Sequence, residues 1–79
     1  MRILFFAHLK DVTGTADTEI KLGESLDADA LWQRLIAAYP GLARFRGSVR
    51  LARNGEYAGA DARFDDADEV ALIPPVSGG

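Results

Sequence analysis

Six residues, Pro74-Pro75-Val76-Ser77-Gly78-Gly79, could carry chemistry, because they would present the α-carboxylate of Gly79 on an extended arm. A carboxylate is a poor acyl donor by itself, since its oxygen is a poor leaving group. An ATP-dependent partner can convert it to an acyl-adenylate, which sulfur or an amine then attacks. Glycine at the reacting position leaves the carbonyl unhindered, since it has no Cβ. Gly79 is therefore the candidate reacting residue.

The residues before Gly79 determine how this carboxylate is presented. Two prolines favour a stiff, extended exit from the fold, because each has a fixed φ and lacks a backbone N–H. A Gly-Gly pair alone is more often a frayed terminus. The diproline and the apolar run 70–73 before it favour instead a flexible tail, residues 74–79, that enters a narrow slot in a partner. Besides Gly79, the residues assigned to this tail are Pro75, Val76, Ser77 and Gly78.

Side-chain sites of the usual kinds are not found in the sequence. His8 is the only histidine and cysteine is absent, so neither a set of zinc ligands nor a reactive thiolate can form. The acidic residues of 61–69 lack the spacing of a calcium loop and suit a solvated connection. No glycine-rich phosphate loop is present, and the serines lack a plausible base. We therefore expect no metal site, no catalytic side chain and no autonomous enzyme.

The composition indicates one small globular domain over residues 1–79, with 48% hydrophobic and 27% charged residues. The net charge of −3 argues against a nucleic-acid partner, since phosphate binding needs a basic surface. No stretch approaches the roughly 20 apolar residues of a membrane span. The start of the sequence is too short for a signal peptide, and the lack of cysteine fits a reducing compartment. We expect a soluble, cytoplasmic protein.

Hydrophobic patterns predict the elements that position the tail. We expect strands at 2–8, 18–22, 48–53, 56–58 and 69–73, and one helix at about 28–39. Asp27 is a good N-cap for this helix, and Pro40-Gly41 should end it. Asn54-Gly55 is the strongest hairpin signal in the chain.

Two connections and a buried helix face complete the expected fold. Residues 10–15 form a connection turned at Gly14, and 59–67 a polar connection anchored by Phe64, in a short 3₁₀ turn. The helix should bury a stripe of four residues, Leu31, Leu35, Ala38 and Tyr39. The predicted core is Leu31, Leu35, Val49, Leu51, Val70 and Leu72.

The predicted order of elements matches an α+β fold of the β-grasp, or ubiquitin-like, type. In that fold a mixed sheet carries one main helix packed on one face. The first and last strands lie side by side and parallel in the middle of the sheet. A fold of this kind would place the tail at the end of a central strand.

The sheet face opposite the helix is a candidate surface for the activating partner. If Val70 and Leu72 face the helix, Ala71 and Ile73 face away from it. One apolar parity of the first strand, Leu4/Phe6 or Ile3/Phe5, would join them, and so would Tyr57. The predicted partner-binding residues are Ile73, Tyr57 and Phe6. The alternative is that a small sheet simply leaves some apolar area exposed.

Four segments together resemble the small subunit of molybdopterin synthase, the MoaD family. They are Ile3-Leu4-Phe5-Phe6-Ala7, Asn54-Gly55-Glu56-Tyr57, Asp68-Glu69-Val70-Ala71 and Pro74-Pro75-Val76-Ser77-Gly78-Gly79. The likeness covers essentially the whole chain. One departure is Ala67, where the family usually has glycine; it changes a turn and involves no functional residue.

The resemblance implies a sulfur carrier that is not catalytic by itself. In that family an E1-like, MoeB-like adenylyltransferase adenylates the terminal glycine, here Gly79, with ATP and Mg²⁺. A sulfurtransferase then converts the adenylate to a thiocarboxylate. The large, MoaE-like subunit binds the loaded carrier in a heterotetramer, where two carrier molecules deliver the two sulfurs that turn cyclic pyranopterin monophosphate into molybdopterin. The chain itself would bind no cofactor.

Three other functions stay open at this point. The thiamine-pathway sulfur carrier ThiS shares the fold and the Gly-Gly end, but it is usually shorter and lacks both the Phe-Phe-Ala start and the Pro-Pro pair. A ubiquitin-like protein modifier would be conjugated to lysines through the same carboxylate. A third possibility is a β-grasp interaction module with no reactive end.

Overall fold

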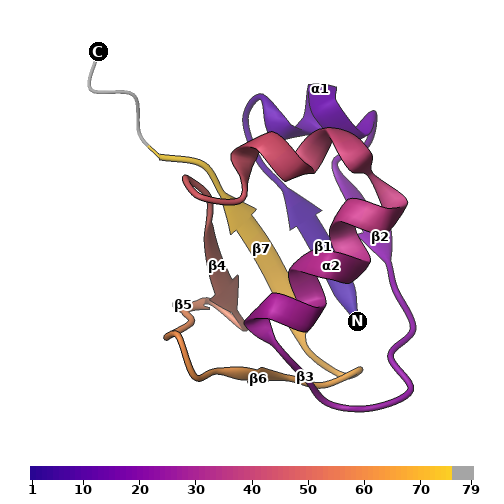
Figure 1. Cartoon of the computed structure of the whole chain (residues 1–79), viewed down its shortest axis with the longest axis vertical. Coiled ribbons are helices and arrows are strands. Elements are labelled where there is room, and N and C mark those ends of the chain that lie inside the picture. Colours follow the sequence, from indigo (N-terminus) through magenta and orange to yellow (C-terminus); the bar gives the residue numbers. More distant parts are fainter. Residues whose placement is uncertain (76–79) are drawn as a thin grey trace.

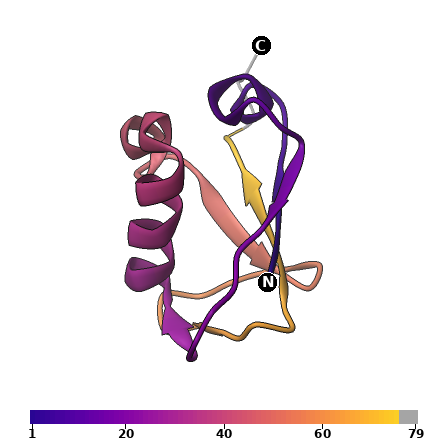
Figure 2. The same cartoon turned by 90° about the vertical axis from the view of Figure 1, so that its right-hand side faces the viewer.

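In a computed structural model, which describes residues 1–75, one long helix crosses one face of a five-stranded sheet (Figures 1 and 2). The strands are β1 (Arg2–Phe5), β2 (Asp17–Glu19), β3 (Leu26–Asp27), β4 (Arg50–Arg53), β5 (Glu56–Tyr57), β6 (Arg63–Phe64) and β7 (Glu69–Ile73). The helices are α1 (Leu9–Thr13), α2 (Ala28–Ala38) and the 3₁₀ helix η1 (Pro40–Phe45). Within residues 1–75, no helix is long and apolar enough to cross a membrane.

The main sheet has the strand order β2-β1-β7-β4-β5. β1 and β7 pair in parallel, with Ile3 opposite Val70 and Phe5 opposite Leu72. The other pairs in this sheet are antiparallel. The predicted β-grasp fold, with a mixed sheet and the first and last strands adjacent at its centre, is therefore confirmed.

The core lies between the sheet and α2 and contains all six predicted core residues, Leu31, Leu35, Val49, Leu51, Val70 and Leu72. Asp27 is the N-cap of α2, and its Oδ1 accepts a hydrogen bond from the Ala30 N–H at 2.8 Å. The buried stripe was predicted wrongly in one respect. Trp32 is buried and Ala38 is exposed, because the buried face turns toward Trp32 and leaves Ala38 on its rim in the last turn.

Most of the connection predicted at residues 10–15 is instead helical, because residues 10–13 belong to the short helix α1. Leu9, at its first position, is fully buried, so a core contact favours the helix. Gly14 ends α1 with φ 78°, and its N–H donates to the Lys10 carbonyl at 2.8 Å. β1 stops at Phe5 rather than at residue 8, because Ala7 has φ 53°, which no strand residue adopts.

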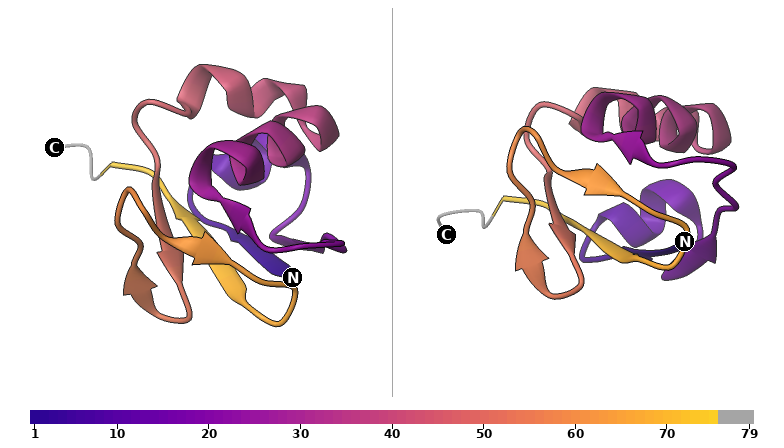
Figure 3. Two further views of the ribbon diagram at one scale, coloured as in Figure 1. Left: turned by 60° about the horizontal axis from the view of Figure 1, so that its bottom comes forward. Right: turned by 90° about the horizontal axis from the view of Figure 1, so that it is seen from below.

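Two further elements, η1 and β6, were not predicted, and each is anchored to the core by a buried side chain of its own. Pro40 begins η1 after the end of α2, and Leu42 of η1 is fully buried. Residues 63–64 form β6, which pairs with β3 rather than making a 3₁₀ turn (Figure 3). Phe64 is 0% exposed, which confirms it as the anchor of this segment. β2 and β4 are also shorter than the strands predicted at 18–22 and 48–53.

The predicted Asn54-Gly55 hairpin joins β4 to β5, and both residues have positive φ, 52° and 89°. Asn54 also joins this hairpin to the turn before β7. Its Nδ2 donates to Asp68 Oδ1 at 3.0 Å, and its Oδ1 accepts from the Glu69 N–H at 2.9 Å. Asp68 Oδ2 closes the turn by accepting from the Asp65 N–H at 2.8 Å. Asn54 therefore determines a turn and a tertiary contact together.

The carboxylates of Asp66 and Asp68, in the turn before β7, should make the protein less stable in acid. The Leu22 N–H, and then the ammonium of Met1, hydrogen-bond Asp66 and lower its pKa. The Asp65 N–H, and then the Asn54 amide, lower the pKa of Asp68. Because both folded-state values lie below the unfolded value of about 3.9, this stabilisation is present above about pH 4. It is lost as the pH falls through the folded-state pKa values.

Urea midpoints measured from neutral pH down to about pH 2 would test this expectation. The Asp68→Asn variant should be less stable at neutral pH, and its midpoint should fall less steeply below about pH 4. A variant profile parallel to that of the unsubstituted chain over the whole range would contradict the role of Asp68.

Candidate functional site

The root of the predicted tail leaves the fold at the end of the central strand β7. β7 ends at Ile73, and Pro74 and Pro75 follow outside any strand, half-buried and exposed respectively. The described residues therefore agree with a diproline exit from the middle of the sheet (Figure 1). The other predicted tail residues, Val76, Ser77, Gly78 and Gly79, lie outside the described residues, so the flexible tail stays a prediction.

The strand register identifies the apolar parity of β1 that faces away from α2. Ile3 and Phe5 are buried on the helix side. Leu4 pairs with Ala71 across β7, and Ala71 pairs with Ala52 across β4. Paired residues lie on one face of a sheet. The outer face therefore carries the Leu4/Phe6 set, and the choice left open by the sequence is settled.

Ile73 and Tyr57 both lie on this outer face. Tyr57 pairs with Ala52 and is 59% exposed. Phe6 follows the last β1 residue, level with Ile73 if the β1–β7 register continues, and is 47% exposed. Ile73 is half-buried. We define the outer patch as Leu4, Phe6, Tyr57, Ala71 and Ile73, so the three predicted partner-binding residues belong to one surface.

A shallow hollow adjoins this outer patch at its β1–β2 side. It is lined by Arg2, Leu4, Phe5, Phe6, Lys10, Ala16 and Asp17. Arg2 and Asp17 form an ion pair at 2.6 Å across its rim. The hollow therefore extends from the apolar surface of Phe6 to the charged side chains of Arg2 and Lys10.

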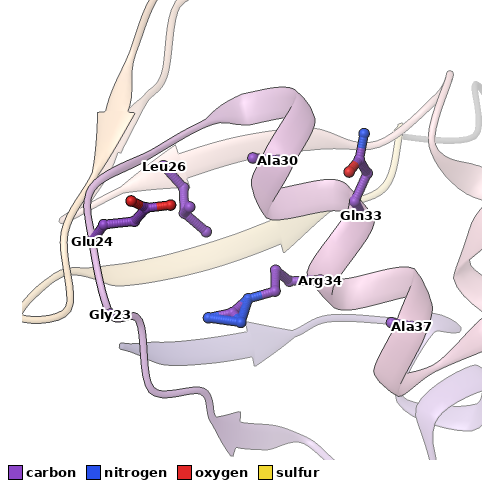
Figure 4. Close-up of a pocket in the computed structure, with 7 residues that line it drawn as sticks. All are labelled: Gly23, Glu24, Leu26, Ala30, Gln33, Arg34 and Ala37. Carbon is purple, nitrogen blue, oxygen red and sulfur yellow. The ribbon is translucent and has the colours of Figure 1, made fainter.

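A second hollow lies between the loop before β3 and the outward side of α2 (Figure 4). Its walls include Glu24, Gln33 and Arg34, and the Arg34 guanidinium donates to the Lys21 carbonyl at 3.0 Å. It contains none of the residues predicted to bind a partner. We therefore place the candidate site on the outer patch and the tail root.

Side-chain chemistry in residues 1–75 is limited. This part of the chain holds no group of three or more histidine, aspartate or glutamate residues placed to bind a metal ion. His8 is exposed, and its ring lies 5.2 Å from the ring of Phe45. Such a surface contact gives His8 no acid–base partner. A reacting group at this site would therefore have to come from the predicted tail.

Arg50 also belongs to the outer face, although the sequence did not indicate it as part of the site. Its guanidinium lies 4.2 Å from the centroid of the Tyr57 ring, on the outer face. The hairpin signal could have indicated this contact. A two-residue turn at Asn54-Gly55 pairs Ala52 with Tyr57, which makes Arg50 and Tyr57 diagonal neighbours. Arg53, at the other end of β4, shares its row with Val70 on the helix side.

Comparisons with known proteins agree with this fold and indicate a family. The ThiS family model matches residues 3–79. A molybdopterin synthase sulfur carrier subunit of Arabidopsis thaliana is 34% identical over 79 residues, which cover 100% of this chain and 82% of the relative. The protein with the same name in Homo sapiens is 32% identical over 82 residues, covering 100% and 93%.

Solved structures extend the likeness to three dimensions. The crystal structure of SAMP1 from Haloferax volcanii matches with a TM-score of 0.84 and 31% identity, covering 100% of this chain and 98% of that one. A complex of subunits 1 and 2 of molybdopterin-converting factor from Helicobacter pylori 26695 matches with a TM-score of 0.68 and 25% identity, covering 99% and 96%. The fold of these proteins is therefore the fold of this chain.

Proposed function

Because this chain belongs to the ThiS family, we propose that it is the sulfur carrier subunit of a molybdopterin synthase. The observation that carries the proposal is the similarity to relatives with that name. Those of Arabidopsis thaliana and Chlamydomonas reinhardtii are 34% and 35% identical to this chain and match 100% of it. The diproline exit from the central strand supports it, because the exit would direct residues 76–79 away from the sheet. The same relatives favour this function over a carrier for thiamine synthesis.

In the proposed reaction the α-carboxylate of Gly79 is the reacting group and no side chain of this chain is catalytic. A carboxylate oxygen attacks the α-phosphorus of ATP in an E1-like partner and releases pyrophosphate. A persulfide on a sulfurtransferase then attacks the acyl carbon and displaces AMP, which leaves an acyl disulfide. A thiol reduces this acyl disulfide, so that the thiocarboxylate is released and the thiol ends in a disulfide with the sulfurtransferase. ATP and Mg²⁺ are used by the activating partner, and this chain holds no cofactor.

The proposed acceptor is cyclic pyranopterin monophosphate, bound by a large subunit. The Helicobacter pylori complex, which joins subunit 1 to subunit 2, supports such a partner for this chain. We propose that the outer patch binds the large subunit, so that residues 76–79 can enter its active site. Two carriers and two large subunits would form a heterotetramer, since each molybdopterin needs two sulfurs. We also place this chemistry in the cytoplasm.

A protein modifier is the second candidate function, and one observation favours it. Two structures of the Haloferax volcanii small archaeal modifier protein match with TM-scores of 0.84 and 0.83. A modifier would use the same activated Gly79 carbonyl, with a lysine amine in place of sulfur as the nucleophile. Intact-mass analysis of the chain from its host separates the two. A carrier would be found with one oxygen replaced by sulfur, and a modifier in amide-linked conjugates.

Replacing Ile73 with glutamate should weaken binding of the large subunit. Ile73 is a half-buried residue of the outer patch, one position before the tail root. The change would bury a carboxylate in an apolar interface, beside Arg50 on the neighbouring strand, at a cost of about 2 kcal/mol or more, roughly 30-fold in Kd. Isothermal titration calorimetry against the large subunit measures the change.

The matched control is Ala37→Glu, which adds the same charge at an exposed position of α2, away from the outer patch. Its Kd should stay within about twofold of the unsubstituted value, and urea unfolding of both variants checks the fold. An Ile73→Glu variant that is folded and binds with unchanged affinity would remove Ile73 from the interface.

A further inference from the structure

Two arginines differ from the rest in how their guanidinium groups are used. Among the residues that the structure describes, five arginines donate hydrogen bonds to oxygen atoms of this chain: Arg2, Arg34, Arg46, Arg53 and Arg63. Arg44 and Arg50 make no hydrogen bond within residues 1–75, and each lies over an aromatic ring. Their donors are therefore available to a group outside this part of the chain.

Of these two arginines, Arg50 is the one that lies beside the root of the tail. It is the first residue of β4 and pairs with Ile73, the last residue of β7, which directly precedes Pro74. It is exposed, on the same face as the outer patch. A positive charge therefore lies beside the root of the tail in a chain whose net charge is −3.

The stack on Tyr57 prepares Arg50 for a planar anion. Its guanidinium carbon is 4.2 Å from the ring centroid, a distance at which cation–π attraction favours the contact. The N–H groups of a guanidinium lie along its edge, where they match the two oxygens of a carboxylate. Holding the side chain in advance also lowers the entropy lost on binding.

We propose that Arg50 is the charge-recognition residue of the interface, where it binds the carboxylate of an aspartate or glutamate on the large subunit. The proposal rests on the proposed function and identifies the chemistry of the partner surface. The exposed Tyr57 lies on the same face as Arg50, and arginine and tyrosine are enriched where proteins bind proteins most tightly. A phosphate ligand fits less well, because Arg50 is on an open strand face without a helix N-terminus or concave pocket.

Calorimetry with the purified large subunit as the probe tests the proposal. The Arg50→Gln variant should bind about 10- to 100-fold more weakly, and its Kd should depend less on salt concentration. Arg50→Lys should recover only part of the loss, because an ammonium keeps the charge without the bidentate geometry. Arg44→Gln is the matched control, since η1 packs with α1 and α2 and lies outside the sheet. Its Kd should stay within about twofold.

A charge-exchange experiment identifies the partner group. Arg50→Glu should abolish most binding, and one acidic-to-arginine variant of the large subunit should restore it. If Arg50→Gln binds within twofold of the unsubstituted chain, or if no such variant restores Arg50→Glu, the proposal is wrong. If Arg50→Gln weakens binding of ATP or pyrophosphate but not of the large subunit, the group recognises phosphate and the proposal is equally wrong.

These outcomes are distinct from failure of the proposed function. An unsubstituted chain that does not bind the large subunit at all would overturn both. A normal Kd for Arg50→Gln, together with normal thiocarboxylate formation on the unsubstituted chain, would overturn only the role of Arg50.

Discussion

Deletion of Gly79 is expected to abolish sulfur loading of this chain and, with it, molybdopterin formation. Gly78 would become the terminal residue, and its carboxylate would fall short of the partner's reacting centre by about 3.3–3.6 Å, the length of one extended residue. A misplacement of about 1 Å can already cost about 100-fold in rate. We therefore expect a loss larger than 100-fold, although the outer patch, with Tyr57 and Ile73, is unchanged and should still bind the partner.

Intact-mass measurement after incubation with the activating enzyme, ATP and a sulfur source gives the result directly. The unsubstituted chain should gain the mass difference between sulfur and oxygen, located in its C-terminal peptide, and the deletion variant should not. Extension by one residue should fail as well, because the carboxylate would pass the reacting centre. Ala37→Glu, at an exposed position of α2 away from the tail, is the control, with loading expected near normal. A deletion variant that supports molybdopterin formation at the normal rate would refute the carrier function.

Local chemistry in the sequence was sufficient to predict several parts of this fold. Asp27 caps α2 as expected, because its carboxylate meets an N–H three residues later. Asn54-Gly55 forms its hairpin because both residues tolerate positive φ. The last strand was predicted with the bounds it has, Glu69–Ile73, since a short apolar run precedes a diproline that cannot continue it. Each of these signals acts within a few residues.

The elements that were missed depend on contacts between distant segments. α1 and η1 each have a fully buried leucine, Leu9 and Leu42, and the two helices pack on one another. Neither segment has a hydrophobic period long enough to indicate a helix by itself. β6 has two residues and exists only because it pairs with β3. Such short elements are stabilised by the completed core, which a local pattern does not reveal.

The candidate site was predicted in the same uneven way. Ile73 and Tyr57 lie on one face as predicted, because alternation along strands decides which side chains share a face. Phe6 follows the last residue of β1, outside the strand pairing. Arg50 was missed as a site residue because its stack on Tyr57 depends on the diagonal across the hairpin. Gly79, the proposed reacting residue, lies outside the described residues, so the proposal for it rests on chemistry and family.

Replacing Phe64 with alanine should unfold a large part of the population, because this side chain anchors residues 58–68, which connect β5 to β7, to the core. Phe64 is 0% exposed and pairs across the small sheet with Leu26, which directly precedes the cap of α2. Removing a buried phenylalanine costs about 3–5 kcal/mol. A domain of this size is expected near the lower end of the usual 5–15 kcal/mol of stability, so little would remain.

Urea unfolding followed by circular dichroism measures this loss, and Phe6→Ala is the matched control. Phe6 is 47% exposed on the outer patch, so the same chemical change there should alter the free energy of unfolding by only about 0.5 kcal/mol. Phe6→Ala should instead weaken binding of the large subunit, because an aromatic anchor would be lost. The two substitutions thus distinguish a residue that stabilises the fold, Phe64, from a residue that contacts the partner, Phe6. A Phe64→Ala variant as stable as the unsubstituted chain would show that residues 59–67 contribute little to the core.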